Sequence, residues 1–309
     1  MKVLVTGAAG FTGMQMMEYL TLQEGVNPVG LIHRQTPGMK SGRGCFEIAD
    51  LLLRDDLERV IRHIAPEAVI HLAGLTHGSA DALFAANVTG TRNLIDAVVA
   101  VNPDCRILVI SSSAVYGYAG ELPISETTPP NPVSEYGTSK AEQEKISSDF
   151  IRNGAAIAIV RPFNLTGPGQ TNSFVCGRIV NQIVEIERGE REFLDLWETA
   201  SSRDLIDVRD AVRGYWALVS HADFSSDCSG KVFNLGSGRA YQISVIIDLI
   251  ESMTGKHYLL HLPEAPPVIT IPTQQSDNSR ITALTGWKPV IPLRDTLRDM
   301  LDAARKRSN

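Results

Sequence analysis

The first twenty residues constrain the fold more than any other stretch of the chain. Lys2 to Thr6 is a β-rich run that ends at a glycine turn, Gly7-Ala8-Ala9-Gly10-Phe11-Thr12-Gly13, and residues 14–20 have helical composition. In a strand, glycine turn and helix of this kind, small residues let the backbone approach a dinucleotide, and the helix N-terminus favours its pyrophosphate. The turn therefore predicts a dinucleotide site, although its spacing is G-x-x-G-x-x-G and a plain tight turn is the alternative.

Strand-like and helix-like segments alternate along the first half of the chain. We expect further strands at 28–32, 46–51, 68–74, 106–110 and 158–164, and helices at 55–64 and 86–97. The apolar run 68–74 is what a parallel strand covered on both faces needs. This order predicts an α/β fold with a Rossmann-type doubly wound parallel sheet and with ligands at the carboxyl ends of the strands.

The alternation fades after residue 164. We therefore expect a dinucleotide-binding domain at residues 1–164, which also carries the catalytic residues. A smaller C-terminal lobe at 165–309 would bind the substrate, with some segments returning to the sheet.

Composition excludes several classes of partner and site. The net charge of −6 gives no polyanion-binding surface, so we expect no nucleic acid partner. The four cysteines are scattered with no metal-binding spacing, and the apolar N-terminal run is too short for a signal peptide or a membrane span. We expect a soluble cytoplasmic protein with no metal and no membrane partner.

The end of the second strand bears on the choice of dinucleotide. It reads His33-Arg34, with no acid to bind the adenosine ribose hydroxyls, whereas an arginine accommodates a 2′-phosphate. Arg34, with Arg43 a weaker candidate, favours NADP, and Asp50 after the third strand is expected near the adenine. NAD stays open, because an exposed loop arginine without function is the alternative.

Hydroxyl and amino groups gather where the fifth strand ends and where the next helix begins. Ser111, Ser112 and Ser113 follow that strand, and Tyr136 and Lys140 stand four residues apart, so both leave one face of a helix. A nearby ammonium lowers the pKa of a phenol, which would make Tyr136 a proton donor and acceptor near neutral pH. Alone, this spacing is common in ordinary helices.

Five segments occur together in one order: the glycine turn and residues 70–73, 87–91, 111–117 and 136–140. With them the chain resembles the extended short-chain dehydrogenase/reductases that act on sugar nucleotides. The resemblance implies that Ser112 hydrogen-bonds the reacting sugar oxygen, that Tyr136 exchanges a proton with it, and that Lys140 binds the nicotinamide ribose and lowers the tyrosine pKa. It also implies a homodimer.

The expected cofactor contacts cover the glycine turn, the following strand ends and the catalytic helix. They are Gly7, Gly10, Phe11, Thr12, Gly13, Arg34, Asp50, Leu51, Leu72, Ala73, Gly74, Asn87, Tyr136 and Lys140.

Residues 161–175 resemble the branch that contains GDP-mannose 4,6-dehydratases and GDP-4-keto-6-deoxy-mannose reductases. That match implies substrate diphosphate contacts at Asn164 and Arg178 and a base pocket lined by Phe174 and Val175. Residues 202–210 match another family segment, which implies that Arg203 approaches phosphate. Ser112 and Ser113 complete the expected substrate contacts.

Two departures from that branch matter. Residues 266–272 hold neither the arginine nor the acid that usually grips phosphate and ribose there, so the nucleotide base stays open. The 4,6-dehydratases also carry a glutamate where this chain has Ser113-Ala114-Val115. Elimination of water needs an acid and a base, so dehydration becomes the less favoured activity.

The favoured hypothesis is NADP-dependent reduction of the 4-keto group of a 4-keto-6-deoxy sugar nucleotide, from GDP-4-keto-6-deoxy-mannose to a GDP-rhamnose-type product. A sugar-nucleotide 4-epimerase that retains NAD is the main alternative. A dinucleotide sensor without catalysis is the non-enzymatic alternative, but it would not need Ser112, Tyr136 and Lys140 together.

Overall fold

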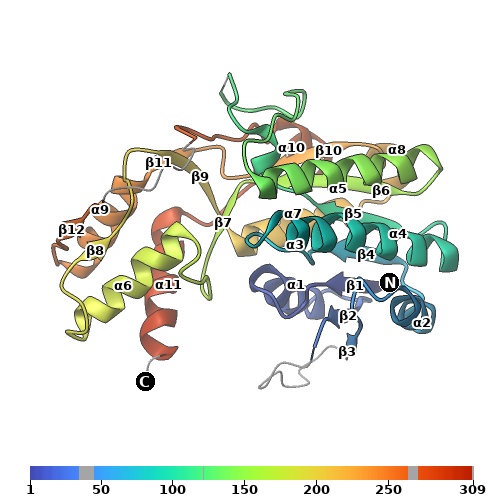
Figure 1. Cartoon of the computed structure of the whole chain (residues 1–309), viewed down its shortest axis with the longest axis horizontal. Helices are drawn as coiled ribbons and strands as arrows, with labels where there is room; N and C mark the ends of the chain where they lie inside the picture. The colour runs from blue at the N-terminus through green and yellow to red at the C-terminus, as the bar shows by residue number, and fades with distance from the viewer. Residues whose placement is uncertain (35–44, 121, 264–270, 308–309) are drawn as a thin grey trace.

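Seven parallel strands form the central sheet (Figure 1). The computed structural model describes residues 1–34, 45–120, 122–263 and 271–307. The strand order is β10-β6-β5-β4-β1-β2-β3, and each neighbouring pair is parallel. The strands are β1 (Lys2–Thr6), β2 (Asn27–Ile32), β3 (Cys45–Ile48), β4 (Ala68–His71), β5 (Arg106–Ile110), β6 (Ile157–Pro162) and β10 (Val232–Leu235). The predicted α/β class with a doubly wound parallel sheet is confirmed.

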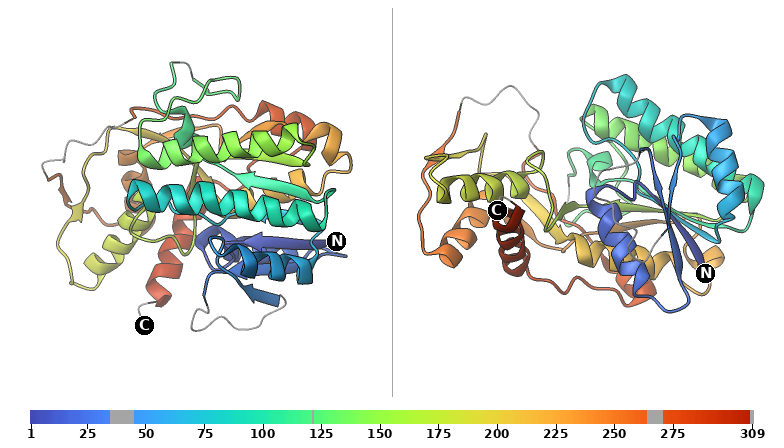
Figure 2. Two further views of the ribbon diagram at one scale, coloured as in Figure 1. Left: turned by 45° about the vertical axis from the view of Figure 1, so that its right-hand side comes forward. Right: turned by 90° about the horizontal axis from the view of Figure 1, so that it is seen from below.

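Helices cover both faces of this sheet (Figure 2). Along β1, Val3 and Val5 pack into one hydrophobic core and Leu4 packs into the other, because successive side chains of a strand point to opposite faces. One layer holds α2 (Arg54–Ile64), α4 (Gly90–Val101) and α5 (Glu135–Arg152). The other holds α1 (Phe11–Thr21), α7 (Val208–Val219), α8 (Phe224–Asp227) and α10 (Ser279–Thr285).

Helix α2 illustrates how the sequence sets this packing. Its apolar residues recur at helical spacing and are the ones it buries: Leu57, Val60, Ile61 and Ile64. Asp55 and Asp56 lie in its first turn, and Arg62 and His63 lie in its last, which suits the helix dipole at each end.

A second lobe stands beside the sheet, at the left of Figure 1. Its three-stranded sheet has the order β11-β9-β7, and β8 pairs with β12. These strands are β7 (Asn164–Thr166), β8 (Leu194–Asp195), β9 (Ser202–Asp207), β11 (Ala240–Gln242) and β12 (Leu260–His261). A separate hydrophobic core lies among α6 (Val175–Glu187), α9 (Ile243–Thr254) and α11 (Leu293–Arg307).

The chain crosses between the two parts several times. Strand β9 of the lobe leads directly into α7 on the large sheet, and β10 then pairs with β6. The expected return of some later segments to the sheet is therefore present, while the division into domains at residues 164 and 165 stays a prediction.

Four expected elements differ from the structure. Strand β4 ends at His71 instead of continuing to residue 74. Strand β3 ends at Ile48 instead of continuing to residue 51. The expected strand 158–164 is split, because β6 ends at Pro162 and Asn164 begins β7, which pairs with β9 in the other sheet. The expected helix at 86–97 is preceded by α3 (Ala80–Phe84) and starts inside a π-helical turn, η1 (Ala85–Thr89). In the part of the chain that the structure describes, no helix is long and apolar enough to cross a membrane.

Candidate active site

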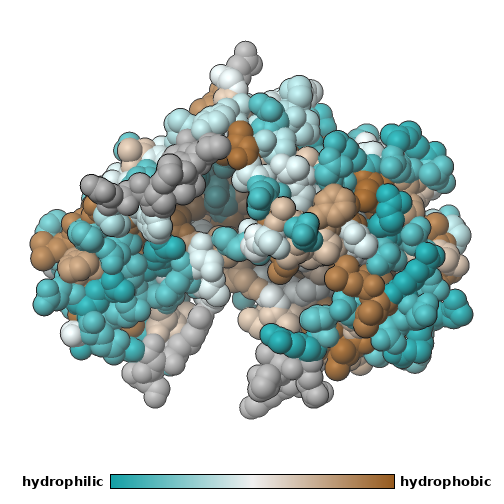
Figure 3. Space-filling model, viewed as in Figure 1, coloured by the Kyte–Doolittle hydropathy of each residue, from teal (hydrophilic) through white to brown (hydrophobic). Residues whose placement is uncertain are grey.

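A cavity of about 410 Å³ opens at the carboxyl ends of β1, β4, β5 and β6. It faces the second lobe, and Figure 3 shows the molecule hollowed between its two parts. This is the place that the parallel sheet predicts for ligands. The predicted site residues that line it are Phe11, Thr12, Leu72, Gly74, Ser112, Ser113, Tyr136, Lys140, Asn164, Phe174 and Val175.

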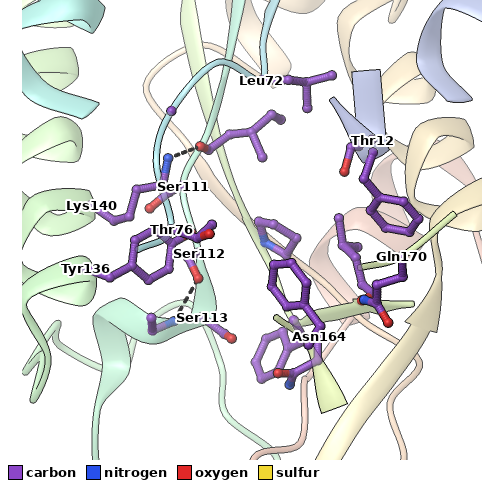
Figure 4. Close-up of a pocket in the computed structure, with 18 of the residues that line it drawn as sticks. Thr12, Leu72, Thr76, Ser111, Ser112, Ser113, Tyr136, Lys140, Asn164 and Gln170 are labelled. Atoms are coloured by element: carbon purple, nitrogen blue, oxygen red, sulfur yellow. Dashed lines mark hydrogen bonds between the residues drawn. The ribbon is translucent and has the colours of Figure 1, made fainter. Parts of the chain in front are cut away.

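Ser112 and Tyr136 lie together on one wall of the cavity (Figure 4). Ser112 precedes a short 3₁₀ turn, η2 (Ser113–Tyr116), and its Oγ accepts the N–H of Ala114 at 3.1 Å. Tyr136 stands in the first turn of α5, whose N-cap Ser134 accepts the N–H of Gly137. The cap and the turn thus hold the serine hydroxyl and the phenol beside each other.

The pKa of Tyr136 moves in the opposite direction from the one predicted. Burial raises it, and interaction with the Ser112 hydroxyl lowers it only in part. Burial also lowers the pKa of Lys140 to about 7, although Glu144 opposes that change. The charged form of Lys140 is itself destabilised by burial, and it does not offset the effect of desolvation on the pKa of Tyr136. Tyr136 is therefore held as a neutral proton donor.

Lys140 is held by two acceptors inside the protein. Its Nζ donates to the carbonyl of Ile110 and to Oε1 of Gln143, both at 2.7 Å. Only 6% of the Lys140 side chain is exposed, and it lines the cavity. In its protonated form Lys140 has three N–H donors, so one is left to face a ligand.

Behind Lys140 runs a buried hydrogen-bonded chain back to β1. Nε2 of Gln143 donates to Oγ1 of Thr91, which is also 2.8 Å from Nε2 of His71. The Thr91 hydroxyl donates to the carbonyl of Asn87, so it accepts from His71, and His71 Nδ1 accepts from Thr6 at 2.7 Å. Burial, with the charge of Lys140, lowers the pKa of His71 to about 3, so this histidine is neutral and its tautomer is fixed by its neighbours.

Asn87 supports the site from behind the cavity wall. Its Nδ2 donates to the carbonyl of Leu75 and to Oγ of Ser139, and its Oδ1 accepts the N–H of Leu75. The side chain is fully buried, and both amide protons are used within the protein. Asn87 therefore joins the loop after β4 to helix α5.

The N-terminal turn fits a dinucleotide. Gly7 has φ = 67°, and a Cβ there would stand 2.8 Å from the N of Ala73. A Cβ on Gly13 would stand 2.1 Å from the O of Gly7, and Gly10 caps α1 without any side-chain hydrogen bond. The N–H groups at the start of α1 are thus open to an anion, as a pyrophosphate requires.

The ends of β2 and β3 lie outside the cavity, where the adenosine half of such a dinucleotide is expected. Arg34 is exposed directly after β2. Nε2 of His33 is 3.1 Å from Oδ2 of Asp50, whose Oδ1 accepts the N–H of Leu52. The side chain of Leu51 packs beside Gly90 at the start of α4. Arg43 lies outside the described residues.

Of the predicted phosphate ligands, Asn164 lines the cavity, but the two arginines, Arg178 and Arg203, do not. Arg178 Nε donates to the carbonyl of Asn172, and Arg203 Nη1 donates to the carbonyls of Ser202 and Ile271. Ile271 does line the cavity, so Arg203 stands directly behind its wall. Most of the segment 266–272, which bears on the nucleotide base, lies outside the described residues.

The sequence did not predict several other lining residues. Thr76 and His77 follow β4, and the rule that ligands gather at carboxyl strand ends could have found them. The His77 ring meets Phe174 edge to face at 5.9 Å, joining the large sheet to the lobe. Gln170 lies within the segment 161–175, whose resemblance implied substrate contacts at other positions, whereas Gln274 and Tyr215 have no pattern near them that points to a site.

The chain is similar in sequence and in structure to known sugar-nucleotide enzymes. The chain is 31% identical to GDP-6-deoxy-D-mannose reductase of Pseudomonas aeruginosa over 97% of this chain and 96% of that protein. The structure of RMD from the same species complexed with NADPH has a TM-score of 0.86 at 30% identity and covers 99% of both chains. UDP-glucuronic acid 4-epimerase from Bacillus cereus, in complex with UDP-glucuronic acid and NAD, has a TM-score of 0.88 at 26% identity, covering 99% of this chain and 100% of that one.

A family model matches residues 3–236. This range covers the large sheet from β1 to β10 and includes Ser112, Tyr136 and Lys140. The chain belongs to the NAD dependent epimerase/dehydratase family.

Proposed function

We propose that this protein reduces the 4-keto group of a GDP-linked 4-keto-6-deoxy sugar with NADPH, giving a GDP-rhamnose-type product. Bound NADPH would supply a hydride to the carbonyl carbon. As that carbon is reduced, its oxygen gains negative charge and needs a proton and a hydrogen-bond donor. The neutral phenol of Tyr136 provides the proton, and the Ser112 hydroxyl binds the oxygen beside it.

Other residues of the chain would bind the cofactor and the nucleotide of the substrate. The start of α1, around Gly10, would hold the pyrophosphate, and Arg34 would meet the 2′-phosphate. The free N–H of Lys140 would bind the nicotinamide ribose. Phe174 and Val175, from the second lobe, would pack on the nucleotide base of the sugar substrate.

The residues that line the cavity favour reduction over dehydration. None of the described lining residues is an aspartate or a glutamate. Elimination of water across C5 and C6 needs an acid and a base at those carbons, while reduction of a ketone needs one proton donor. This lack of a carboxyl group beside a neutral phenol is the observation that carries the proposal.

The test is NADPH oxidation by the purified protein given GDP-4-keto-6-deoxy-mannose, followed by its absorbance. We expect steady turnover, and we expect Tyr136→Phe to lower kcat by roughly 10²- to 10⁴-fold, since it removes the proton donor. Tyr118→Phe is the matched control, because Tyr118 is half exposed and does not line the cavity. Ordinary turnover by Tyr136→Phe would contradict the proposed mechanism.

A 4-epimerase is the second candidate, because the chain is also similar to an epimerase bound to NAD. An epimerase interconverts two sugar nucleotides with no net consumption of cofactor. Product formation from a 4-hydroxy sugar nucleotide without added NADPH would therefore favour the epimerase over the reductase.

A further inference from the structure

Tyr215 is a fully buried tyrosine that reaches the active-site cavity. It lies on α7, and its side chain is 0% exposed within the core that α1 and α7 share with the sheet. It nevertheless lines the cavity that holds Ser112, Tyr136 and Lys140. Tyr136 comes from α5 on the opposite face of the sheet, so the two tyrosines approach the cavity from opposite layers of helices.

The hydroxyl of Tyr215 has no hydrogen-bond partner among the described residues. Within the described ranges, two other buried side-chain polar atoms share this property, Nη1 of Arg161 and Nδ1 of His221, but neither residue lines the cavity. By contrast, the equally buried Tyr116 donates its hydroxyl proton to Oδ1 of Asn234 at 2.6 Å.

An unpaired buried hydroxyl is costly to the fold. Leaving such a group without a partner destabilises the folded protein, and a phenylalanine would fill the same space without that penalty. The presence of the Tyr215 hydroxyl at the cavity wall is explained if a bound ligand supplies its hydrogen-bond partner.

The position of Tyr215 indicates which part of a ligand it meets. The pyrophosphate of a dinucleotide belongs at the start of α1, and Phe11 and Thr12 at that point line the cavity. The nicotinamide half then enters the cavity from the α1 side, which is the side of α7. Tyr215 packs in the core of the large sheet and not in the core of the second lobe, where the sugar nucleotide is expected.

We propose that the Tyr215 hydroxyl hydrogen-bonds the carboxamide of the cofactor's nicotinamide ring. This deepens the proposed function and rests only on its cofactor-binding half. A neutral phenol can both donate to the carboxamide oxygen and accept from its NH₂ group. Burial raises the pKa of Tyr215, and the nearby Tyr136 adds to that rise, so the phenol stays neutral.

The test compares two ligands and one variant, without any sugar substrate. NADPH and 2′-phospho-ADP-ribose share everything except the nicotinamide ring, and their affinities for the wild type and for Tyr215→Phe are measured by calorimetry. We expect Tyr215→Phe to bind NADPH roughly three- to tenfold more weakly and to bind 2′-phospho-ADP-ribose equally well. NADH and ADP-ribose serve as the pair if the protein prefers NAD, so the result does not depend on which reaction the enzyme performs.

Thermal unfolding of the cofactor-free protein gives an independent readout. Tyr215→Phe removes an unpaired group, so its Tm is expected to equal or exceed that of the wild type. The matched control Tyr116→Phe leaves Asn234 without its donor and is expected to lower the Tm. The proposal is overturned if Tyr215→Phe changes both affinities by the same factor, or leaves both unchanged. It is also overturned if that variant lowers the Tm as much as the control does.

Discussion

The buried surroundings of Lys140 determine its pKa more than its spacing from Tyr136 does. The spacing from Tyr136 to Lys140 correctly places both on one cavity wall, but it does not reveal what else the ammonium contacts. The carbonyl of Ile110 and the side-chain amide oxygen of Gln143 each accept a hydrogen bond from its Nζ. Both of these partners are buried with the lysine. Burial therefore dominates the pKa of both the lysine and the tyrosine.

The lowered pKa of Lys140 predicts a specific pH dependence of stability. Between about 7 and the ordinary value of 10.5, the unfolded chain binds a proton at this residue that the folded protein does not. The free energy of unfolding should thus rise with pH above 7, by at most about 1.4 kcal/mol per pH unit. We expect Lys140→Met to remove this contribution between pH 7 and 9, as measured by urea unfolding.

Lys145→Met is the control for this experiment, because Lys145 is exposed on the same helix. It should keep the slope of the wild type. A Lys140→Met variant with an unchanged slope would show that the lysine is not destabilised by burial.

Arg34 is the residue that we propose to favour NADP over NAD. Its guanidinium is exposed at the end of β2, where a charge-assisted hydrogen bond to the 2′-phosphate would form. We expect Arg34→Ala to weaken NADPH binding about tenfold and to leave NADH binding unchanged. Arg62→Ala, which removes an exposed arginine from α2, should alter neither affinity, and an equal loss for both cofactors in Arg34→Ala would contradict the assignment.

Helices and strands were predictable where the pattern is local. β1 and β5 begin and end at the residues that the sequence indicates, and α2 begins within one residue of the expectation. The small strands of the lobe were not predictable, since β8 and β12 are short and pair only through tertiary structure. The site residues that were missed, such as Tyr215 and Gln274, are brought to the cavity by elements with no local signal.

The packing of α1 on β1 depends on one glycine. A Cβ on Gly13 would lie 2.1 Å from the O of Gly7 and 2.7 Å from the Cα of Ala8, both backbone atoms that cannot move aside cheaply. We expect Gly13→Ala to lower the free energy of unfolding by about 1–3 kcal/mol and to abolish measurable NADPH binding. Chemical denaturation and calorimetry measure the two effects.

Gly120→Ala is the matched substitution, because a Cβ there meets nothing within 4 Å. Its stability and its NADPH affinity should both equal those of the wild type. A Gly13→Ala protein that binds NADPH normally would show that the turn is not the pyrophosphate site.

The two parts of the molecule are tied together through Asp204. This buried carboxylate on β9 accepts the N–H groups of Ser237, Gly238 and Ser276 and the hydroxyls of both serines. Ser237 follows β10 of the large sheet, so one side chain joins the lobe to that sheet.

We expect replacement of the Asp204 carboxylate by an amide to weaken the contact between the lobe and the large sheet. Asp204→Asn would turn an NH₂ group toward N–H donors, and we expect a loss of about 2–3 kcal/mol in the free energy of unfolding, measured in urea. Asp248→Asn, at an exposed position on α9, should cost nothing measurable. Equal stability of the two variants would contradict the role given to Asp204.

The pairing of β10 with β6 has a consequence for dissecting this protein. The segment Val232–Leu235 closes the sheet on the side of β6, although it follows β6 by about seventy residues. A fragment that stops at residue 164 would keep the pairing of β6 with β5 but leave the other edge of β6 without its partner, and an open strand edge invites association with other chains. We therefore expect such a fragment to associate more readily than residues 1–309, and cofactor affinity is better measured on the longer polypeptide.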